Sequence, residues 1–343
     1  MKIAVDAMGG DYAPKAVVEG AVEAVKNDDI DILLVGDTDK INKEIRKIKN
    51  YPAHRIKILH TEKAIDMHDS HIASVRKKKN SSMSLGINLI KNNEVDAFVS
   101  AGNTGAVVCA ATLYLGLLPG IERPGIAILF PTMEGVSLVV DVGANIDPKP
   151  LHLLQYAIMA EAYYSHVLDH KGAPTVGLLN VGEEATKGPD YVKETHRLLS
   201  QTSLNFIGNV EGKEIFSGRC NIIVCDGYVG NVALKVTESV AEMLKALLKK
   251  AMLRGIIGKL GTLLLFNNLK RFRKDLDYSE YGGAPLLGVN GVVIIAHGRS
   301  SAKAMKNAIK AAKTEVERKV NEKIINEVSR MSSRINPQNT PIQ

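Results

Sequence analysis

The feature that most constrains this chain is a unit that it repeats: a short apolar run, a polar loop that contains glycine, and a helical pattern. In the copy at residues 221–240, the apolar run precedes a loop that holds Asp226, Gly227, Gly230 and Asn231. Glycine lets the backbone approach a ligand closely, and the helix that follows offers free N–H groups and a positive dipole to an anion. A single connection of this kind is common in α/β proteins. Only its repetition makes it evidence for a ligand site.

Apolar runs alternate with helical patterns along most of the chain. Strands are expected at residues 3–5, 32–35, 56–59, 95–100, 126–130, 136–140, 175–179, 222–225 and 292–296. The alternation predicts an α/β fold of three layers, α/β/α, in which helices cover both faces of a mostly parallel sheet; the fifth and sixth runs predict a hairpin within it. We expect one catalytic α/β domain over residues 1–330, either undivided or in two lobes around a cleft, and a polar, flexible tail over 331–343.

Composition limits the kinds of binding partner and the cellular compartment that we expect. The chain of 343 residues carries a formal net charge of +7, has no Trp and has only 5% aromatic residues. The charge predicts an acidic partner or surface, whereas the scarcity of aromatic side chains argues against a nucleic-acid partner. Three cysteines without a Cys-x-x-Cys pair are typical of a reducing cytosol. With no signal pattern at the N-terminus, and with polar residues inside the uncharged run 97–121, we expect a cytoplasmic protein without a transmembrane segment.

Polar loops that contain glycine follow several predicted strands, near Gly102, Gly143, Gly182, Gly227 and Gly298. Ligands of an open α/β sheet bind outside the carboxyl ends of its strands, so we expect these loops to line one cleft. The cleft has no phosphate-loop or dinucleotide motif and no cluster of metal ligands, which predicts chemistry without a cofactor or a metal. It offers side chains that suit an oxyanion or inorganic phosphate: Asn103, Asn145, Asn180, Asn231, Lys187 and His297.

A basic run that begins at Arg76 precedes Ser81 and Ser82, one of which is expected to cap a helix. Cations beside a helix N-terminus are typical of a phosphate site. They are equally typical of a basic loop that water solvates, and both interpretations stay open.

Residues 250–274 combine a very apolar pattern with many cations. Interior glycines predict two short helices with a bend near Gly261. An apolar face framed by lysine and arginine is typical of a helix on anionic lipid, although a core-packed helix or a dimer contact has the same pattern. The residues expected to contact a membrane or an acidic carrier protein are Leu253, Ile256, Ile257, Leu260, Leu264, Phe266, Arg271 and Arg273.

Several stretches resemble one family closely, the bacterial phosphate acyltransferases known as PlsX. They are Asp6–Asp11, Arg76–Ser82, Val99–Gly105, Asp141–Asn145, Leu179–Glu184, Gly208–Gly212, Cys225–Asn231, Tyr281–Gly288 and His297–Ser300. The resemblance implies conversion of acyl-acyl carrier protein and inorganic phosphate to acyl phosphate, for phospholipid synthesis. It also implies a fold like that of phosphotransacetylases and isocitrate or isopropylmalate dehydrogenases, a homodimer, and a cytosolic enzyme that visits the membrane, where an acyltransferase consumes acyl phosphate.

For this reaction we expect phosphate to attack the thioester directly, with Lys187, Asn231 and His297 as the catalytic residues. Asn231 or Lys187 would stabilise the carbonyl oxygen, and His297 would protonate the leaving sulfur unless it is simply a satisfied histidine at a strand end. Asp6 and Asp141 are better explained as capping groups than as reactants. Phosphate or substrate contacts are expected from Asp6, Gly9, Gly10, Arg76, Ser81, Ser82, Gly102, Asn103, Thr104, Gly105, Asp141, Asn145, Asn180, Gly182, Asp226, Gly227 and Gly230.

Two alternatives stay open. Cys225 ends a predicted strand in the cleft region, so an acyl-cysteine intermediate would have a nucleophile there. A non-catalytic protein that binds anionic lipid or nucleic acid would explain the charge, but it leaves the polar loops unexplained.

Overall fold

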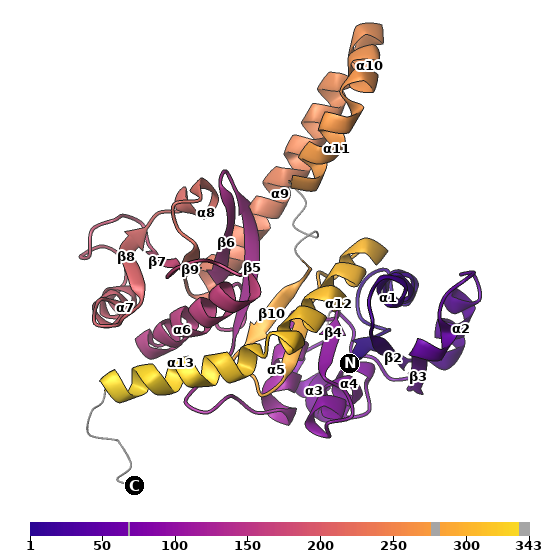
Figure 1. The fold of residues 1–343 in the computed structure, drawn as a ribbon, viewed down its shortest axis with the longest axis horizontal. Helices are drawn as coiled ribbons and strands as arrows, with labels where there is room; N and C mark the ends of the chain where they lie inside the picture. The colour runs from indigo at the N-terminus through magenta and orange to yellow at the C-terminus, as the bar shows by residue number, and fades with distance from the viewer. Residues whose placement is uncertain (68, 276–281, 336–343) are drawn as a thin grey trace.

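The computed structural model describes residues 1–67, 69–275 and 282–335, without the side chains of 256–257, 259–260, 271–275 and 332–335. Its centre is an 11-stranded sheet in the order β3-β2-β1-β4-β11-β10-β5-β6-β9-β7-β8, covered by helices on both faces (Figure 1). The strands are β1 (Lys2–Asp6), β2 (Asp31–Gly36), β3 (Ile56–His60), β4 (Ala97–Ser100), β5 (Gly125–Thr132), β6 (Gly135–Val140), β7 (Thr175–Leu179), β8 (Asn205–Val210), β9 (Ile222–Val224), β10 (Ala284–Leu287) and β11 (Val292–Ile295). This is the predicted three-layer α/β fold with a mostly parallel sheet.

The helices fill the connections between these strands. They are α1 (Lys15–Asn27), α2 (Thr38–Ile45), the 3-10 turn η1 (Ala53–Arg55), α3 (His71–Lys77), α4 (Ser82–Lys91), α5 (Thr104–Tyr114), α6 (Pro150–Val167), α7 (Asp190–Ser200), α8 (Glu214–Ser217), α9 (Gly227–Met252), α10 (Gly255–Leu264), α11 (Phe266–Asp275), α12 (Ala302–Glu317) and α13 (Val320–Ile335).

Two parallel half-sheets are joined through β10 and β5. β10 pairs antiparallel with β11 at Ala284 and with β5 at Leu286, and β5 pairs antiparallel with β6, so the half-sheets run in opposite directions. They are also staggered along the strand direction. β11 ends at Ile295, which pairs with Ala284 at the start of β10. β6 ends at Val140, which pairs with Ala127 of β5, and Ala127 follows Ile126, the residue that pairs with Leu286 of β10. The carboxyl ends of the two half-sheets therefore approach each other near the middle of the sheet.

Alternation along the strands sends neighbouring side chains to opposite layers. In β1, Ile3 and Val5 join the cluster under α1 and α12, whereas Ala4 joins the cluster that includes α4 and α5. A further cluster packs α6 and α13 against β6 and β9. Burial of these apolar faces fixes the positions of the strand ends, which the polar loops follow.

Nine of the strands were predicted from their apolar runs, including the β5–β6 hairpin, but β8 and β10 were not. β8 contains Gly208 and Asn209, and β10 is only four residues long and contains Pro285, so neither shows a continuous apolar run. The predicted tail is also too long at its N-terminal side. Helix α13 continues to Ile335 because Ile324, Val328 and Met331 are buried, and residues 336–343 lie outside the described chain.

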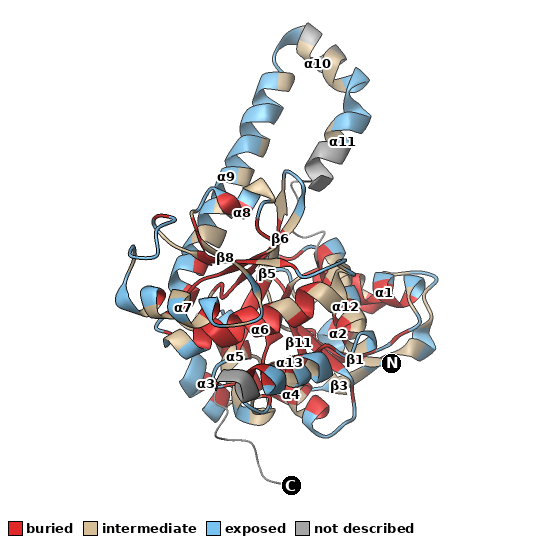
Figure 2. Ribbon diagram, turned by 60° about the vertical axis from the view of Figure 1, so that its left-hand side comes forward, coloured by how far each residue is buried: buried red, intermediate tan, exposed pale blue. Residues whose placement is uncertain are grey.

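An arm projects from the body of the molecule, built from most of α9 together with α10 and α11 (Figures 1 and 2). The bend expected near Gly261 is misplaced: the chain reverses after Met252, where Gly255 adopts a φ of 70°, and a second break follows at Leu265. Thr262 Oγ1 ties the reversal together by donating to the Met252 carbonyl at 3.1 Å. Gly261 lies inside α10, where an added Cβ would meet no described atom of another element within 4 Å.

The arm exposes large apolar side chains. Leu264 is 86% exposed and Phe266 61%, and Leu253 is exposed as well. The side chains of Ile256, Ile257, Leu260, Arg271 and Arg273 lie outside the described part, so membrane or carrier contact for this set stays a prediction. Within residues 1–67, 69–275 and 282–335, no helix is both long and apolar enough to cross a membrane.

Candidate active site

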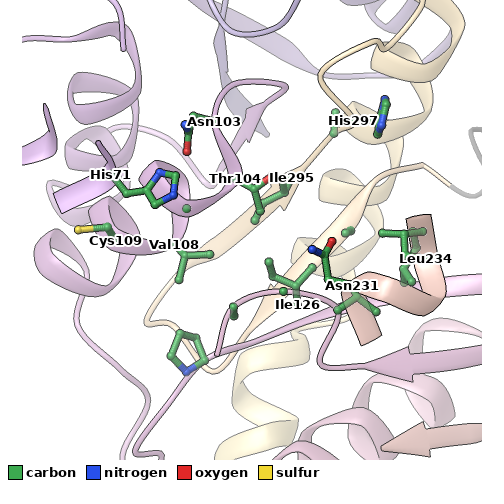
Figure 3. Close-up of a pocket in the computed structure, with 18 of the residues that line it drawn as sticks. His71, Asn103, Thr104, Val108, Cys109, Ile126, Asn231, Leu234, Ile295 and His297 are labelled. Atoms are coloured by element: carbon green, nitrogen blue, oxygen red, sulfur yellow. The ribbon is translucent and has the colours of Figure 1, made fainter. Parts of the chain in front are cut away.

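A cavity of about 1050 Å³ opens where the two half-sheets meet. Helices α3, α5 and α9, strand β5, the loop after β6 and the segment after β11 all line it, and Figure 3 shows their side chains around one space. Cavities of roughly 300–1,000 Å³ hold most small ligands, so this one has room for a long flexible molecule. From the predicted set, the structure brings Arg76, Asn103, Thr104, Gly105, Asn145, Asn231 and His297 to its wall.

The first wall follows β4. The Asn103 side chain caps α5, since its Oδ1 accepts from the Ala106 N–H at 3.0 Å, while its Nδ2 donates to the Met67 carbonyl at 2.8 Å. Thr104 then opens α5, whose first turn directs free N–H groups and the positive end of the helix dipole toward this end of the cavity. Further along, α5 lines the cavity with Val108, and β5 adds Ile126 and Ile128. One end of the cavity is thus polar and another side is apolar.

The second wall is the loop after β6, which is organised by buried Asp141. Its two carboxylate oxygens accept N–H groups from Ile126, Gly143, Ala144 and Asn145 at 2.7 to 3.1 Å. Burial raises the pKa of this carboxyl group, and the four N–H donors oppose that rise. The arrangement agrees with the expectation that Asp141 caps the loop.

The third wall is the start of α9. Asp226 caps the helix by accepting from the Tyr228 and Val229 N–H groups, both at 2.9 Å, and Tyr191 donates its hydroxyl to the same carboxylate at 3.0 Å. Gly230 passes so close to the second wall that an added Cβ would lie 1.9 Å from the Asp141 carbonyl oxygen. This close approach places Asn231 next to Gly143, so the second and third walls are in contact.

Among the four predicted amide side chains, Asn231 differs from the others. Asn103 is committed as a cap, Asn145 donates to the Pro124 carbonyl and the Tyr156 hydroxyl, and Asn180 donates to the Lys187 carbonyl. The Asn231 amide has no hydrogen-bond partner within the described residues, and Figure 3 shows it among the side chains around the cavity. It is the one of the four that is available to a ligand.

His297 lies on the cavity wall just beyond β11, which pairs with β4, and belongs to a charged group. Its Nε2 lies 3.5 Å from Glu238 Oε1, and Lys235 Nζ lies 3.1 Å from the other oxygen of the same carboxylate. Burial lowers the pKa of His297, Glu238 opposes that shift, and Lys235 adds to it. Lys235 and Glu238 both line the cavity, together with His71 and Arg123.

Lys235 and Glu238 were not among the predicted site residues, although the sequence carries a signal for them. Asn231, Leu234, Lys235 and Glu238 recur at i, i+3, i+4 and i+7 and form one face of α9. The prediction followed the apolar positions of the same helix instead, which lie on another face. His71 and Arg123 carry no comparable signal, because a helix and a loop distant in sequence bring them to the cavity.

The loop after β7 does not line the cavity. Lys187, Asn180 and Gly182 belong to this loop, which β9 separates from β6. The expectation of five loops around one cleft is therefore corrected to four, and a catalytic role of Lys187 stays a prediction without support from the geometry.

Other predicted contacts form the layer beneath the cavity wall. Asp6 is buried and accepts from Ser100 Oγ at 2.8 Å, and Gly9 packs against Asp6 and the Gly102 backbone N. Ser81 caps α4 through the Ser84 N–H at 3.2 Å, as expected for one of the two serines. The remaining members of this layer, which do not line the cavity, are Gly10, Ser82, Gly102, Asp141, Asp226, Gly227 and Gly230.

Cys225 is poorly placed for the acyl-cysteine alternative. Its side chain is 3% exposed, does not line the cavity and donates to the Asp141 carbonyl at 3.3 Å. Burial, with Asp141 and Asp226 nearby, raises the pKa of the thiol well above its usual value, so the thiolate needed for attack is disfavoured. A covalent route through Cys225 is therefore disfavoured.

Comparison with known proteins identifies the relatives of this chain. A family model described as fatty acid synthesis protein matches residues 1–323. The phosphate acyltransferase of Dictyoglomus turgidum is 48% identical over 336 residues, which cover 97% of this chain and 99% of the relative. That of Geotalea uraniireducens is 49% identical over 324 residues, covering 94% and 93%.

Solved structures share the fold at low identity. A phosphotransacetylase from Streptococcus pyogenes superposes with a TM-score of 0.59 at 20% identity, covering 92% of this chain and 94% of that one. A 4-hydroxythreonine-4-phosphate dehydrogenase from Klebsiella pneumoniae gives 0.56 at 10% identity, covering 92% and 99%. These structures bear out the predicted fold, and the sequence matches over nearly its full length show that this chain belongs to the phosphate acyltransferase family of fatty acid synthesis proteins.

Proposed function

We propose that the protein transfers the acyl group of an acyl-acyl carrier protein to inorganic phosphate, giving acyl phosphate for phospholipid synthesis and free carrier protein. The observation that carries the proposal is the cavity, in which the Asn231 amide, without a partner among the described residues, a helix N-terminus and an imidazole face an apolar side. A thioester with a long acyl chain needs the apolar side, and phosphate needs the polar end.

The reaction balances without an external base. An oxygen of hydrogen phosphate attacks the thioester carbonyl, the carbon–sulfur bond breaks, and the phosphate proton ends on the sulfur of the leaving thiol. Asn231 is placed to donate to the carbonyl oxygen as it becomes negative, and the N-terminus of α5 receives a phosphate oxygen. His297 carries the proton between phosphate and sulfur.

A carrier protein explains why the cavity is open at the surface. The thioester must enter on a flexible arm while the acidic carrier stays outside. Arg76 and Arg123 are exposed residues of the lining, which suits an anionic partner at the entrance.

A homodimer accounts for the exposed apolar stripe of α9. Val232, Val236, Val240, Met243 and Leu247 are each at least 43% exposed and recur at i, i+4, i+8, i+11 and i+15. On the helical wheel they face away from the Asn231–Glu238 side, so a second copy can cover them without blocking the cavity. Replacing Val236 and Leu247 by Glu is expected to turn the dimer into a monomer in light scattering, and an unchanged mass would contradict this interface.

The arm suggests a cytoplasmic protein that associates peripherally with an anionic membrane or with a membrane acyltransferase. Leu264 and Phe266 lie beside the junction of α10 and α11, and Lys249, Lys250 and Arg254 precede it in the chain. Apolar side chains flanked by cations bind the surface of anionic bilayers, where the product is consumed.

The test of the reaction follows free thiol and acyl phosphate together, with purified protein, a long-chain acyl-carrier-protein thioester and inorganic phosphate. Equal amounts of both products, dependent on phosphate and unaffected by EDTA or nucleotides, are expected. Thiol release without phosphate would point to a thioesterase, and no release would refute the proposed reaction.

A further inference from the structure

The proposed reaction gives no role to Lys235 and Glu238, which line the cavity beside His297. Lys235 lies one helical turn after Asn231, and residues at this spacing have Cβ atoms roughly 5–6 Å apart. Its ammonium is held 3.1 Å from Glu238 Oε2, so it stays on the face that also carries Asn231. Among the cations that line the cavity, Arg76 and Arg123 come from α3 and from the segment before β5, whereas Lys235 shares a helix face with the proposed oxyanion donor.

The tautomer of His297 follows from its backbone contact. The Arg299 N–H donates to His297 Nδ1 at 3.2 Å, so Nδ1 is the acceptor and a neutral ring carries its proton on Nε2. Nε2 in turn faces Glu238 Oε1 at 3.5 Å. Glu238, whose side chain is only 14% exposed, therefore links the imidazole and the ammonium through its two oxygens.

We propose that Lys235 is the residue that binds the attacking phosphate, and that Glu238 is a positioning residue that holds Lys235 and His297 on the cavity wall. This rests on the proposed function. Phosphate bound by Lys235 lies within one helical turn of Asn231 and beside His297, where the nucleophile, the carbonyl oxygen and the proton carrier have to meet. It assigns the phosphate-binding cation to α9 and not to Lys187, which does not line the cavity.

The kinetic test measures initial rates against phosphate and against acyl substrate separately. Lys235→Met is expected to raise the KM for phosphate about tenfold or more, the usual effect of losing a hydrogen bond to a charged group, with little change in the KM for the acyl substrate. Lys245→Met is the matched control, since Lys245 lies on the same helix but does not line the cavity. A normal phosphate KM in Lys235→Met, or an equally raised one in Lys245→Met, would overturn the assignment.

The second test follows the His297 imidazole by NMR as pH is varied. The charged groups that act on it are Glu238 and Lys235 from α9, Arg299 from its own loop and Asp11 from the loop after β1. Glu238→Gln is expected to lower the pKa of His297 and Lys235→Met to raise it, because the carboxylate favours the imidazolium and the ammonium opposes it. Glu238→Asp should restore part of the shift, and Lys245→Met should cause none.

These outcomes separate the inference from the reaction itself. Shifts of the same sign, or no shift in either variant, would overturn the linked arrangement even if the wild-type enzyme is fully active. Absence of phosphate-dependent thiol release in the wild-type protein would instead refute the proposed function. Melting temperatures of all variants show whether any loss comes from unfolding.

Discussion

Helix α9 begins in the cavity wall and ends in the projecting arm, and its two parts differ in what surrounds their side chains. Between Gly227 and Glu238, one face meets the Asp141 loop and the cavity. Beyond Val240 the helix leaves the body and its apolar side chains are exposed (Figure 2). The same helical pattern thus supports a reaction site at one end and a contact surface at the other.

The difference shows that different faces and different ends of one helix can serve a reaction site and a contact surface. Residues 231, 234, 235 and 238 face the cavity, whereas 232, 236, 240, 243 and 247 face away from it. A substitution on the first set should change catalysis without changing association, and a substitution on the second set should do the reverse. The predictions below test this separation, beginning with the largest expected effect.

Asn231→Ala removes the Asn231 amide from the cavity face of α9. We expect the turnover rate to fall about 10²–10³-fold, the usual cost of losing one donor to a developing oxyanion. Vesicle binding should not change. Asn267→Ala in α11 is the matched control, because it removes an amide from the arm, and its turnover should stay normal. Equal losses in both variants would contradict the separation.

Leu264→Glu combined with Phe266→Glu places two charges on the exposed part of the arm. Burying a large apolar side chain contributes about 1.5–3 kcal/mol, so binding to vesicles of anionic phospholipid should weaken at least about tenfold. Turnover with a short-chain thioester free in solution should stay near the wild-type value. Sedimentation with vesicles measures the first effect, and undiminished binding would show that the arm does not contact lipid.

Gly230→Ala forces a methyl group against the Asp141 carbonyl oxygen, where the two cavity walls meet. Overpacking of this kind typically costs about 1–3 kcal/mol in the free energy of unfolding, and activity should fall with it. Gly261→Ala is the comparison in the arm, where the added methyl group meets nothing and should stabilise α10 by up to about 1 kcal/mol. Urea unfolding measures both changes, and equal effects would contradict the packing described here.

Cys225→Ala should have the smallest effect on the reaction. The thiol is buried, and its pKa is raised by burial, so it takes no part in direct attack by phosphate. We expect the activity per folded molecule to stay within about twofold of the wild type, with a stability loss of about 1 kcal/mol from the vacated space. Complete loss of activity in a folded variant would revive the acyl-cysteine route.

Much of the fold was predictable from sequence because apolar runs, glycine loops and caps are local signals. Ser81 caps α4 as predicted for one of the two serines, and Asn103 and Asp226 cap the helices that follow the predicted strands β4 and β9. β10 was not predictable, because its short run with Pro285 becomes a strand only through pairing with β11 and β5. Since β10 and β5 together join the two half-sheets, the position of the cavity was not predictable either.

Some residues of the candidate site were also predictable from local signals, whereas others depend on how the elements pack. Asn231 and His297 follow strands and were found from their loops, and both line the cavity. Lys187 also follows a strand, but the order of strands places its loop elsewhere, and strand order is not a local property of the sequence. Lys235 and Glu238 lie inside a helix, where charged side chains are ordinarily solvated, so only the packing of α9 shows that they face the cavity.

The central claim is that phosphate attacks the thioester directly within the cavity. The most direct test mixes enzyme at high concentration with the acyl-carrier-protein thioester in a rapid-quench apparatus, first without phosphate and then with it. We expect no release of thiol before phosphate is added, and equal release of thiol and acyl phosphate afterwards. A burst of one thiol per active site without phosphate would show an acyl-enzyme and contradict the account.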